Sequence, residues 1–351
     1  MARPLPDILP VPWPAELPVP PARTEEAVTR AAKLLAAGGL VAIPTETVYG
    51  LAADALDAEA VDRIFAAKGR PATNPLIVHV ANTAMARSLA AAWPQEAEQI
   101  TTSLWPGPVT VIVPRGRRIP DNVTAGGPTV ALRCPEHRLT RRLIATLGRP
   151  LAAPSANRSM QLSPTTAGHV LDSLGNRIDL ILDGGPCSRG IESTVVDCTV
   201  NPPRVLRPGP IGRAELEAVL GGPVLDTTEV RDDAQTTPAR SPGTLARHYA
   251  PKTPLEVSST AADRVESLVQ SGKRVAWLTA LIEDPRVRSL ASSRDVLVVP
   301  MPADPAAFAT SLYATLHAID RRSLDLIIID APPDTDAWRA VTDRLRRATK
   351  A

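Results

Sequence analysis

The spacing of apolar and polar positions along this chain predicts helices and strands in alternation over most of its length. A helix is predicted to begin at Thr24, a residue type that favours helix N-caps, and to end at Gly38. An apolar strand over 40–43 follows. A second helix is predicted over 58–68, because Asp57 can cap its start and a glycine follows its end. This order of elements is typical of an α/β fold.

Further short apolar runs, each bounded by turn residues, predict strands in the first two thirds of the chain. They lie at 76–80, 109–113, 129–132, 150–153, 178–182 and 193–197. Helical patterns separate several of them, so we expect an N-terminal α/β domain with a twisted, mixed sheet over 23–213. The first 22 residues hold eight prolines, which indicates an extended arm over 1–22 rather than a folded element.

A second, smaller domain is predicted after a linker over 214–253, a stretch rich in Gly, Pro, Thr and Asp that has little periodicity. Strands at 274–279, 295–299 and 325–330 then alternate with helices near 304–320 and 336–348. This pattern predicts a parallel, Rossmann-like α/β domain over 254–351. It has no glycine-rich phosphate-binding motif, so we expect a regulatory, lid-holding or assembly role for it.

Composition narrows the classes of function. The chain has 351 residues, a net charge of +2 and 3% aromatic residues, so strong direct binding of nucleic acid is not expected. Cys134, Cys187 and Cys198 form no C-x-x-C pair and have no histidine at ligand spacing, which argues against a zinc site or a disulfide framework and fits the reducing cytoplasm. No apolar run reaches the roughly 20 residues of a membrane helix, and the start of the chain lacks a signal-peptide core.

Two short blocks indicate a site for a polyanion. Lys68 and Arg70 stand at the end of a predicted helix, and Ser155 and Asn157 follow a short apolar run. Cations neutralise phosphate charge, while hydroxyl and carboxamide groups fix geometry. Only five of the 39 basic residues are lysines, so a lysine at position 68 suggests a need for a compact, rotatable charge, as at nucleotide phosphates. The alternative is a solvated lysine favoured by the helix dipole.

Several motifs follow one another in a specific order along the first domain. They are Pro44-Thr45-Glu46-Thr47-Val48-Tyr49-Gly50, Lys68-Gly69-Arg70, Asn74-Pro75-Leu76, Ala131-Leu132-Arg133, Pro154-Ser155-Ala156-Asn157, Ser193-Thr194 and Leu206-Arg207-Pro208-Gly209. In this order they resemble the YrdC family, specifically the long two-domain form of threonylcarbamoyl-AMP synthase. The resemblance covers about residues 24–212, and the long form carries a linker and a C-terminal α/β unit like those predicted here.

The resemblance implies a reaction. ATP, L-threonine and bicarbonate (or CO2) would be joined to give L-threonylcarbamoyl-AMP and pyrophosphate. A tRNA threonylcarbamoyl transferase would then move the threonylcarbamoyl group to tRNAs that read codons starting with A. Mg2+ is expected to enter with ATP, held mainly by phosphate oxygens and water, since no carboxylate cluster resembles a dedicated metal site.

The resemblance also implies which residues form the site. The ATP site would comprise Lys68, Arg70, Asn74, Thr129, Ser155, Asn157, Ser163, Arg207 and Tyr249. Within it, the catalytic group would be Lys68, Arg70, Ser155 and Asn157. The L-threonine site would comprise Thr47, His79, Arg133, Ala153 and Ser193, with Arg133 pairing with the substrate carboxylate.

Several of these residues also have a purely structural interpretation. His79 lies on an apolar strand, where a lone histidine often has a structural role, and Arg133 can be a surface charge at a strand end. Ser163 is a helix-cap signal, Thr129 a typical strand residue, and Tyr249 either a closing residue or a simple anchor of the linker.

Two other functions compete with the synthase. The first is an RNA-binding module for tRNA or double-stranded RNA, which the low net charge and scarce aromatic residues disfavour. The second is a carbamoyl-adenylate step on a different acceptor, as in hydrogenase-maturation enzymes. This chain lacks the zinc-finger and acylphosphatase-like segments that accompany the domain in those enzymes.

Overall fold

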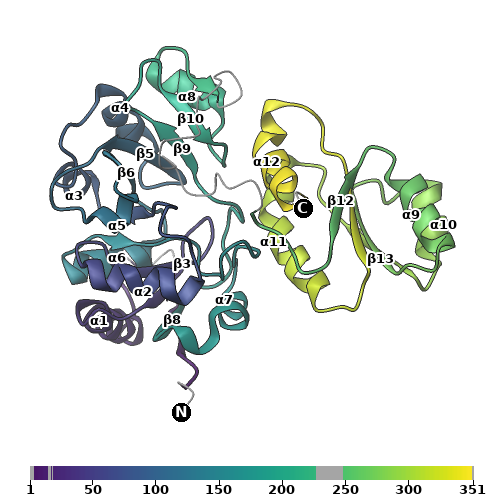
Figure 1. Cartoon of the computed structure of the whole chain (residues 1–351), viewed down its shortest axis with the longest axis horizontal. Helices are drawn as coiled ribbons and strands as arrows, with labels where there is room; N and C mark the ends of the chain where they lie inside the picture. The colour runs from purple at the N-terminus through teal and green to yellow at the C-terminus, as the bar shows by residue number, and fades with distance from the viewer. Residues whose placement is uncertain (1–3, 15–16, 18, 227–247, 350–351) are drawn as a thin grey trace. The chain divides into compact units, whose positions relative to one another are not determined.

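The computed structural model describes residues 4–14, 17, 19–226 and 248–349, and the chain separates into two units (Figure 1). The first unit contains residues 1–159 and 163–244, and the second contains 160–162 and 245–351. Each unit has its own sheet and is described by itself.

The first unit is built on one mixed sheet. Among the described residues its strands are β1 (Asp7–Pro10), β2 (Val41–Ile43), β3 (Gly50–Asp54), β4 (Ile77–His79), β5 (Val109–Pro114), β6 (Thr129–Arg133), β7 (Leu151–Ala152), β8 (Leu180–Asp183), β9 (Thr194–Asp197), β10 (Arg204–Arg207) and β11 (Leu225–Asp226). Their order across the sheet is β1-β8-β2-β3-β7-β4-β6-β5-β9-β10-β11. Parallel pairs such as β4 with β6 alternate with antiparallel pairs such as β5 with β6, so the predicted mixed sheet is confirmed.

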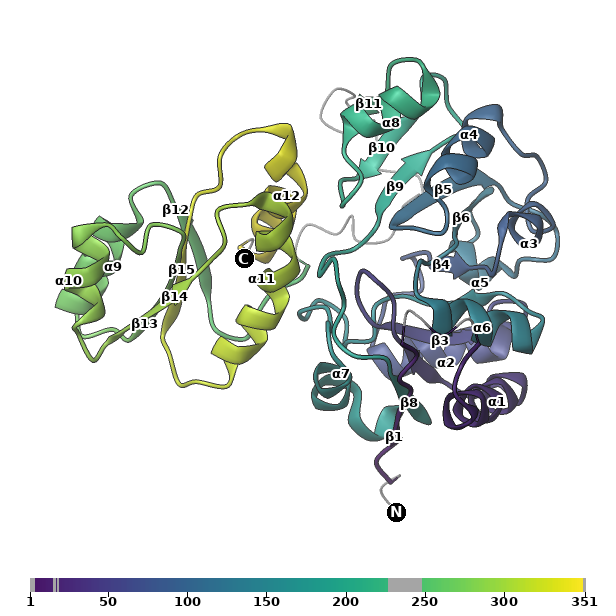
Figure 2. The same cartoon turned by 180° about the vertical axis from the view of Figure 1, so that it is seen from behind.

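Helices cover both faces of this sheet. They are α1 (Ala22–Ala36), α2 (Ala58–Lys68), α3 (Thr83–Arg87), α4 (Gln95–Leu104), α5 (Asp121–Thr124), α6 (Arg138–Leu147), α7 (Ala167–Leu174) and α8 (Arg213–Leu220), and a 3-10 turn, η1 (Gly175–Arg177), follows α7. Helices α1 and α6 pack against each other (Figure 2). Strand β2 shows how two cores arise, because successive side chains of a strand point to opposite faces. Val41 and Ile43 join the core under α1 and α6, while Ala42 joins the core that contains residues of α2.

The predicted bounds of the second helix are confirmed, and local chemistry explains them. The Asp57 side chain accepts hydrogen bonds from the backbone N–H groups of Glu59 (3.0 Å) and Ala60 (3.2 Å). Gly69 ends α2 with a φ of 62°, in the left-handed region that favours glycine. Lys68 is therefore the last residue of α2, at the point where the chain turns away from the helix axis.

The predictions for the first 24 residues need correction. Asp7–Pro10 is not part of a free arm, since it forms β1 and pairs in parallel with β8. The first helix begins at Ala22 rather than Thr24, and Pro21 precedes it without a side-chain cap. The Thr24 hydroxyl instead donates to the carbonyl oxygen of Pro12 (2.9 Å), so a tertiary contact takes the group that was expected to cap the helix.

The predicted linker is wrong at its N-terminal end. Helix α8 and strand β11 occupy residues 213–226, and β11 adds to the sheet beside β10. Residues 227–247 of the predicted linker lie outside the described residues.

The second unit is a parallel α/β structure, as predicted. Its strands β12 (Leu255–Ser258), β13 (Val275–Thr279), β14 (Val296–Pro300) and β15 (Leu326–Asp330) are ordered β12-β15-β13-β14, with every pair parallel. Its helices are α9 (Ala261–Gln270), α10 (Pro285–Ala291), α11 (Pro305–Asp320) and α12 (Arg339–Ala348), with a 3-10 turn, η3 (Asp336–Trp338), before α12. Figure 1 shows α9 and α10 on one face of the sheet and α11 and α12 on the other. Strand β12 was not predicted, and none of the described helices is long and apolar enough to cross a bilayer.

Candidate active site

The centre of the candidate site is the contact between Lys68 and the loop that contains Ser155 and Asn157. The Lys68 ammonium (Nζ) donates to the carbonyl oxygens of Ser155 and Asn157, each at 2.5 Å. In return, the Ser159 N–H donates to the Lys68 carbonyl oxygen at 2.9 Å. Residues separated by 87 and 89 positions in the sequence are thus brought together, as the polyanion-site prediction requires.

The loop is fixed by the start of β3. The Ala156 N–H donates to the Tyr49 carbonyl oxygen (2.7 Å), and the Leu51 N–H donates to the Pro154 carbonyl oxygen (2.7 Å). Backbone hydrogen bonds on both sides of Ser155 therefore hold the loop. The carbonyl oxygens that bind Lys68 belong to this fixed backbone.

Lys68 is buried, with 2% of its surface exposed, so the alternative of a solvated helix-end lysine is wrong. Burial, and then repulsion from Arg70, lowers the pKa of Lys68 well below its usual value. Within the described residues the ammonium has carbonyl oxygens as partners and no carboxylate. An anion that enters this site would stabilise the charged form of the lysine.

Arg70 and Asn74 form the next part of the site. Arg70 donates from Nε to the Asn74 carbonyl oxygen (3.1 Å) and from Nη2 to the Pro75 carbonyl oxygen (2.8 Å). Asn74 is 3% exposed, and within residues 4–14, 17, 19–226 and 248–349 neither its Nδ2 nor its Oδ1 has a hydrogen-bond partner. Because buried polar groups are nearly always paired, these two atoms point to a ligand that supplies an acceptor and a donor.

His79 and Arg133 are direct neighbours on adjacent strands, at the ends of β4 and β6. Burial, and then the charge of Arg133, lowers the pKa of His79 to about 3, so its imidazole is neutral at physiological pH. In the described part of the chain the His79 Nδ1 atom makes no hydrogen bond of normal geometry, although the Ile77 backbone also acts on this ring. Arg133 is 4% exposed, so its interpretation as a surface charge is wrong.

Arg133 forms a buried ion pair that was not predicted. Its Nη2 lies 2.5 Å from Oε1 of Glu46, and the second carboxylate oxygen of Glu46 accepts from the Glu136 N–H at 3.0 Å. The sequence signal for Glu46 is its place in a polar segment at a strand end, a location where α/β folds often keep functional groups. Its partner stands 87 positions away, which the sequence alone does not reveal.

Ser193 and Arg207 are also brought together. Arg207 donates from Nε (3.1 Å) and Nη2 (3.0 Å) to the Ser193 carbonyl oxygen, and from Nη2 to the Ser193 hydroxyl (3.1 Å). The Ser193 hydroxyl also lies 2.8 Å from the Thr110 hydroxyl. All three side chains are buried, so the predicted third cation and a predicted threonine contact occupy one polar cluster.

Three further predicted residues lie on the loops around these groups. The Thr47 hydroxyl is 2.9 Å from that of Thr45, and the Ala153 N–H donates to the Ile77 carbonyl oxygen (3.0 Å). Ser163 donates to Oε1 of Glu192 at 2.5 Å, so it acts as a buried hydrogen-bond donor rather than a helix cap.

The last two predicted ATP contacts are Thr129 and Tyr249. Thr129 is half-buried at the first position of β6, four residues before Arg133, which corresponds to about 13 Å along a strand. Tyr249 belongs to the second unit, where its ring lies 5.1 Å from the Arg344 guanidinium and 6.0 Å from the Tyr313 ring.

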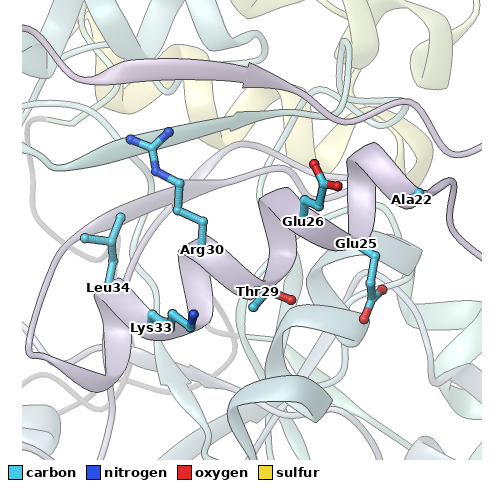
Figure 3. A pocket seen from close by; sticks show the side chains of 7 residues that line it. All are labelled: Ala22, Glu25, Glu26, Thr29, Arg30, Lys33 and Leu34. Atoms are coloured by element: carbon cyan, nitrogen blue, oxygen red, sulfur yellow. The ribbon is translucent and has the colours of Figure 1, made fainter.

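A surface hollow of about 680 Å³ lies elsewhere, along α1, and it is lined by Ala22, Glu25, Glu26, Thr29, Arg30, Lys33 and Leu34 (Figure 3). Its Glu25 pairs with Arg142 and its Arg30 pairs with Asp7. None of the predicted site residues lines it. Nowhere in the described ranges do three or more His, Cys, Asp or Glu side chains gather as a metal site would require.

Comparison with known proteins gives the fold and site a family. A family model described as "Telomere recombination" matches residues 33–209, and one described as "Threonylcarbamoyl-AMP synthase, C-terminal domain" matches residues 211–350. The threonylcarbamoyl-AMP synthase of Bacillus subtilis is 40% identical over 92% of both chains, and that of Pyrococcus abyssi is 40% identical over 91% of this chain and 93% of its own. A crystal structure of P. abyssi Sua5 complexed with L-threonine superimposes with a TM-score of 0.86 at 36% identity, covering 98% of this chain and 97% of that one.

The chain has an α/β fold with a mixed sheet and buried cations at the candidate site. Together with these relatives, these features define an enzyme of the nucleotidyltransferase type. The chain belongs to the threonylcarbamoyl-AMP synthase family, in its two-domain form, which confirms the resemblance seen in the motifs.

Proposed function

We propose that this chain makes L-threonylcarbamoyl-AMP and pyrophosphate from L-threonine, CO2 or bicarbonate, and ATP. The observation that carries the proposal is the buried Lys68 ammonium, held by carbonyl oxygens of the Ser155–Asn157 loop without a carboxylate partner in the described residues. Such a group suits the negative charge of a triphosphate. The named relatives support the same reaction class.

The chemistry needs alignment and charge neutralisation. The nitrogen of L-threonine attacks the carbon of CO2 and loses a proton, which gives a carbamate. A carbamate oxygen then forms a bond to the α-phosphorus of ATP while the bond from that phosphorus to the pyrophosphate oxygen breaks. Lys68 and Arg70 offset the charge that develops on the departing pyrophosphate. The loop residues Ser155 and Asn157 keep the lysine in place for this step.

The remaining nucleotide contacts follow from the family resemblance. The carboxamide of Asn74, which has no partner among the residues that the structure describes, offers a donor and an acceptor that a nucleotide can satisfy. We assign ATP contacts also to Thr129, Ser163, Arg207 and Tyr249. Mg2+ enters with the triphosphate, with phosphate oxygens and water as its main ligands.

In this proposal, L-threonine binds to the side chains around Arg133. The guanidinium pairs with the substrate carboxylate, and neutral His79, Thr47, Ser193 and the Ala153 backbone read the amine and hydroxyl. The relative from P. abyssi whose structure contains L-threonine supports an amino-acid site in this fold.

The product is a mixed anhydride, which is reactive and must be consumed by a group transfer. We propose that a tRNA threonylcarbamoyl transferase in the cytoplasm receives it and modifies tRNAs that read codons starting with A.

A labelling assay tests the proposal. The purified chain is incubated with ATP, labelled L-threonine and labelled bicarbonate, and both pyrophosphate and the labelled adenylate are measured. We expect pyrophosphate release to require L-threonine and bicarbonate together, with both labels in one product. Pyrophosphate release that is indifferent to L-threonine would contradict the proposal.

A further inference from the structure

We propose that Glu46 is a positioning residue that fixes the Arg133 guanidinium for the carboxylate of L-threonine. This inference rests on the proposed function, since it assigns a task within the same amino-acid site. It concerns a residue that binds no substrate itself but decides how a substrate-binding side chain is held.

Glu46 is immobilised at several points. Its side chain is 3% exposed, and its two carboxylate oxygens have different partners, Arg133 for Oε1 and the Glu136 N–H for Oε2. Its own backbone carbonyl oxygen accepts from the Arg189 N–H at 2.7 Å. One backbone N–H holds the carboxylate of Glu46 and another holds its main chain, so Glu46 is fixed and Arg133 must adapt to it.

Arg133 keeps donor capacity after this pairing. Glu46 engages its Nη2, whereas its Nε is buried and has no hydrogen-bond partner among the described residues. A guanidinium has five N–H donors in a fixed fork, so holding one nitrogen orients the rest. Beside it, the buried Nδ1 of His79 also makes no hydrogen bond of normal geometry to any described residue. Two adjacent buried side chains with open polar atoms indicate a ligand that completes them.

A purely structural ion pair explains these observations less well. Burying an ion pair is costly, and apolar residues of similar volume often give equal or greater stability. Leaving the Arg133 Nε and the His79 Nδ1 unpaired adds to that cost. The arrangement makes sense when a ligand supplies the missing partners.

The pair also sets which charge the site accepts. With Glu46 beside it, Arg133 belongs to a group without net charge, because the neighbouring His79 is neutral. A group of this kind suits the single carboxylate of a zwitterionic amino acid. Lys68, without a carboxylate partner in the described residues, suits the more strongly charged phosphates. The Arg133 group and Lys68 therefore distinguish the two substrates by their charge.

The test uses Glu46→Gln, which keeps the shape of the side chain and removes its charge. The Kd of L-threonine is measured by calorimetry, and the KM values of L-threonine and ATP by steady-state kinetics. We expect the Kd and KM for L-threonine to rise about tenfold or more, equivalent to about 1.4 kcal/mol, while the KM for ATP stays within about twofold.

Asp54→Asn is the matched control. The Asp54 carboxylate is 1% exposed, lies 2.5 Å from the half-exposed Arg149 and accepts from the Leu56 N–H at 3.0 Å, so it is another buried carboxylate beside an arginine, at the end of β3 away from Gly50. Its loss should lower the melting temperature without a selective effect on L-threonine. Glu46→Asp serves as a second variant in case the glutamine variant does not fold. It keeps the charge with a shorter reach, and a rise of several fold in the KM for L-threonine alone is expected.

Three results would overturn the inference. They are unchanged L-threonine affinity in both Glu46 variants, equal rises in the KM values of L-threonine and ATP, and the same L-threonine defect in Asp54→Asn. All three results require a wild-type reference enzyme that binds and uses L-threonine. A wild-type enzyme that does neither would overturn the proposed function and this inference with it.

Discussion

The two units each bury a cation, and they hold it in opposite ways. In the first unit, the Lys68 ammonium is 2% exposed and donates to two carbonyl oxygens. In the second unit, Arg344 is 1% exposed and its Nη1 lies 2.8 Å from Oδ2 of Asp343, a carboxylate on the same helix. One buried charge has neutral partners, and the other has a partner of opposite charge.

This difference separates a binding site from a structural cluster. A buried charge without a counter-charge destabilises the fold unless a ligand neutralises it, so it is kept where a ligand binds. A buried charge with a counter-charge is already satisfied. Arg346 and Arg347 also donate to Asp343, at 3.1 and 3.0 Å, so this one carboxylate has three arginine partners. The comparison predicts opposite consequences for substitutions in the two units.

The largest effect is expected for Lys68→Met. The substitution keeps an apolar chain of similar length and removes the charge that offsets the leaving pyrophosphate. The rate of adenylate formation should fall by at least about 10³-fold, or about 4 kcal/mol, while thermal unfolding followed by circular dichroism remains cooperative. Lys33→Met, at an exposed position of α1, should leave the rate unchanged. A Lys68 variant with a tenth of the wild-type rate would contradict the role given to this lysine.

A smaller effect, on stability rather than chemistry, is expected for Asp343→Asn. The substitution leaves buried Arg344 without its counter-charge, which should lower the free energy of unfolding of the second unit by about 3 kcal/mol. Amide hydrogen exchange of β12, β13, β14 and β15 measures this unit selectively. Asp336→Asn is the control, because its carboxylate is 65% exposed and its pair with Arg339 should contribute less than about 1 kcal/mol. Equal losses in the two variants would argue against Asp343 as the counter-charge of Arg344.

The same cluster predicts a pH dependence. Burial alone would raise the pKa of Asp343, but attraction to Arg344 and hydrogen bonds from Arg347 and Arg346 outweigh it and hold the pKa below the usual value. A carboxyl with a lowered folded-state pKa contributes stability above its unfolded pKa of about 3.9 and loses it as the pH falls through the folded value. The difference in melting temperature between wild type and Asp343→Asn should therefore shrink below about pH 4. A constant difference down to pH 2 would contradict this.

The smallest effect is expected at His79. Its folded pKa of about 3 lies below the unfolded value, so the unfolded chain binds a proton first and this residue lowers stability as the pH falls below about 6.5. In the folded protein the imidazole should stay neutral from pH 5 to pH 8. NMR of histidine labelled with ¹⁵N should show no titration of His79 in that range, and a midpoint near pH 6.5 would contradict its burial beside Arg133.

Local signals in the sequence were enough for some elements and not for others. Helix α2 was predicted to the residue, because Asp57 and Gly69 act on the backbone next to them. The closeness of Lys68 to Ser155 and Asn157 was predicted from their residue types as a polyanion site and supported by the family resemblance, although nothing in either block encodes the distance to the other. The roles of these residues in catalysis stay predictions.

The elements that were missed depend on distant partners. Strand β1 is proline-rich, and its partner β8 lies more than 170 positions along the chain. Strand β3 reads Gly-Leu-Ala-Ala-Asp and is fully buried, so it shows no alternation of polar and apolar residues. The Glu46–Arg133 pair joins a loop to the end of β6. The Thr24 hydroxyl donates to the Pro12 carbonyl oxygen instead of capping the helix. In each case a contact between remote segments overrides the local preference.

The position of β1 at the edge of the sheet has a practical consequence for truncated and fusion versions of this chain. Asp7 to Pro10 form the edge strand of the sheet and pair with one edge of β8 from Leu180 to Asp183. Deleting the first 11 residues would leave a row of unsatisfied amide and carbonyl groups on β8, a template onto which strands of neighbouring molecules can add. Shortened versions of this chain should therefore precipitate during purification, whereas a fusion attached ahead of residue 4 leaves that edge shielded.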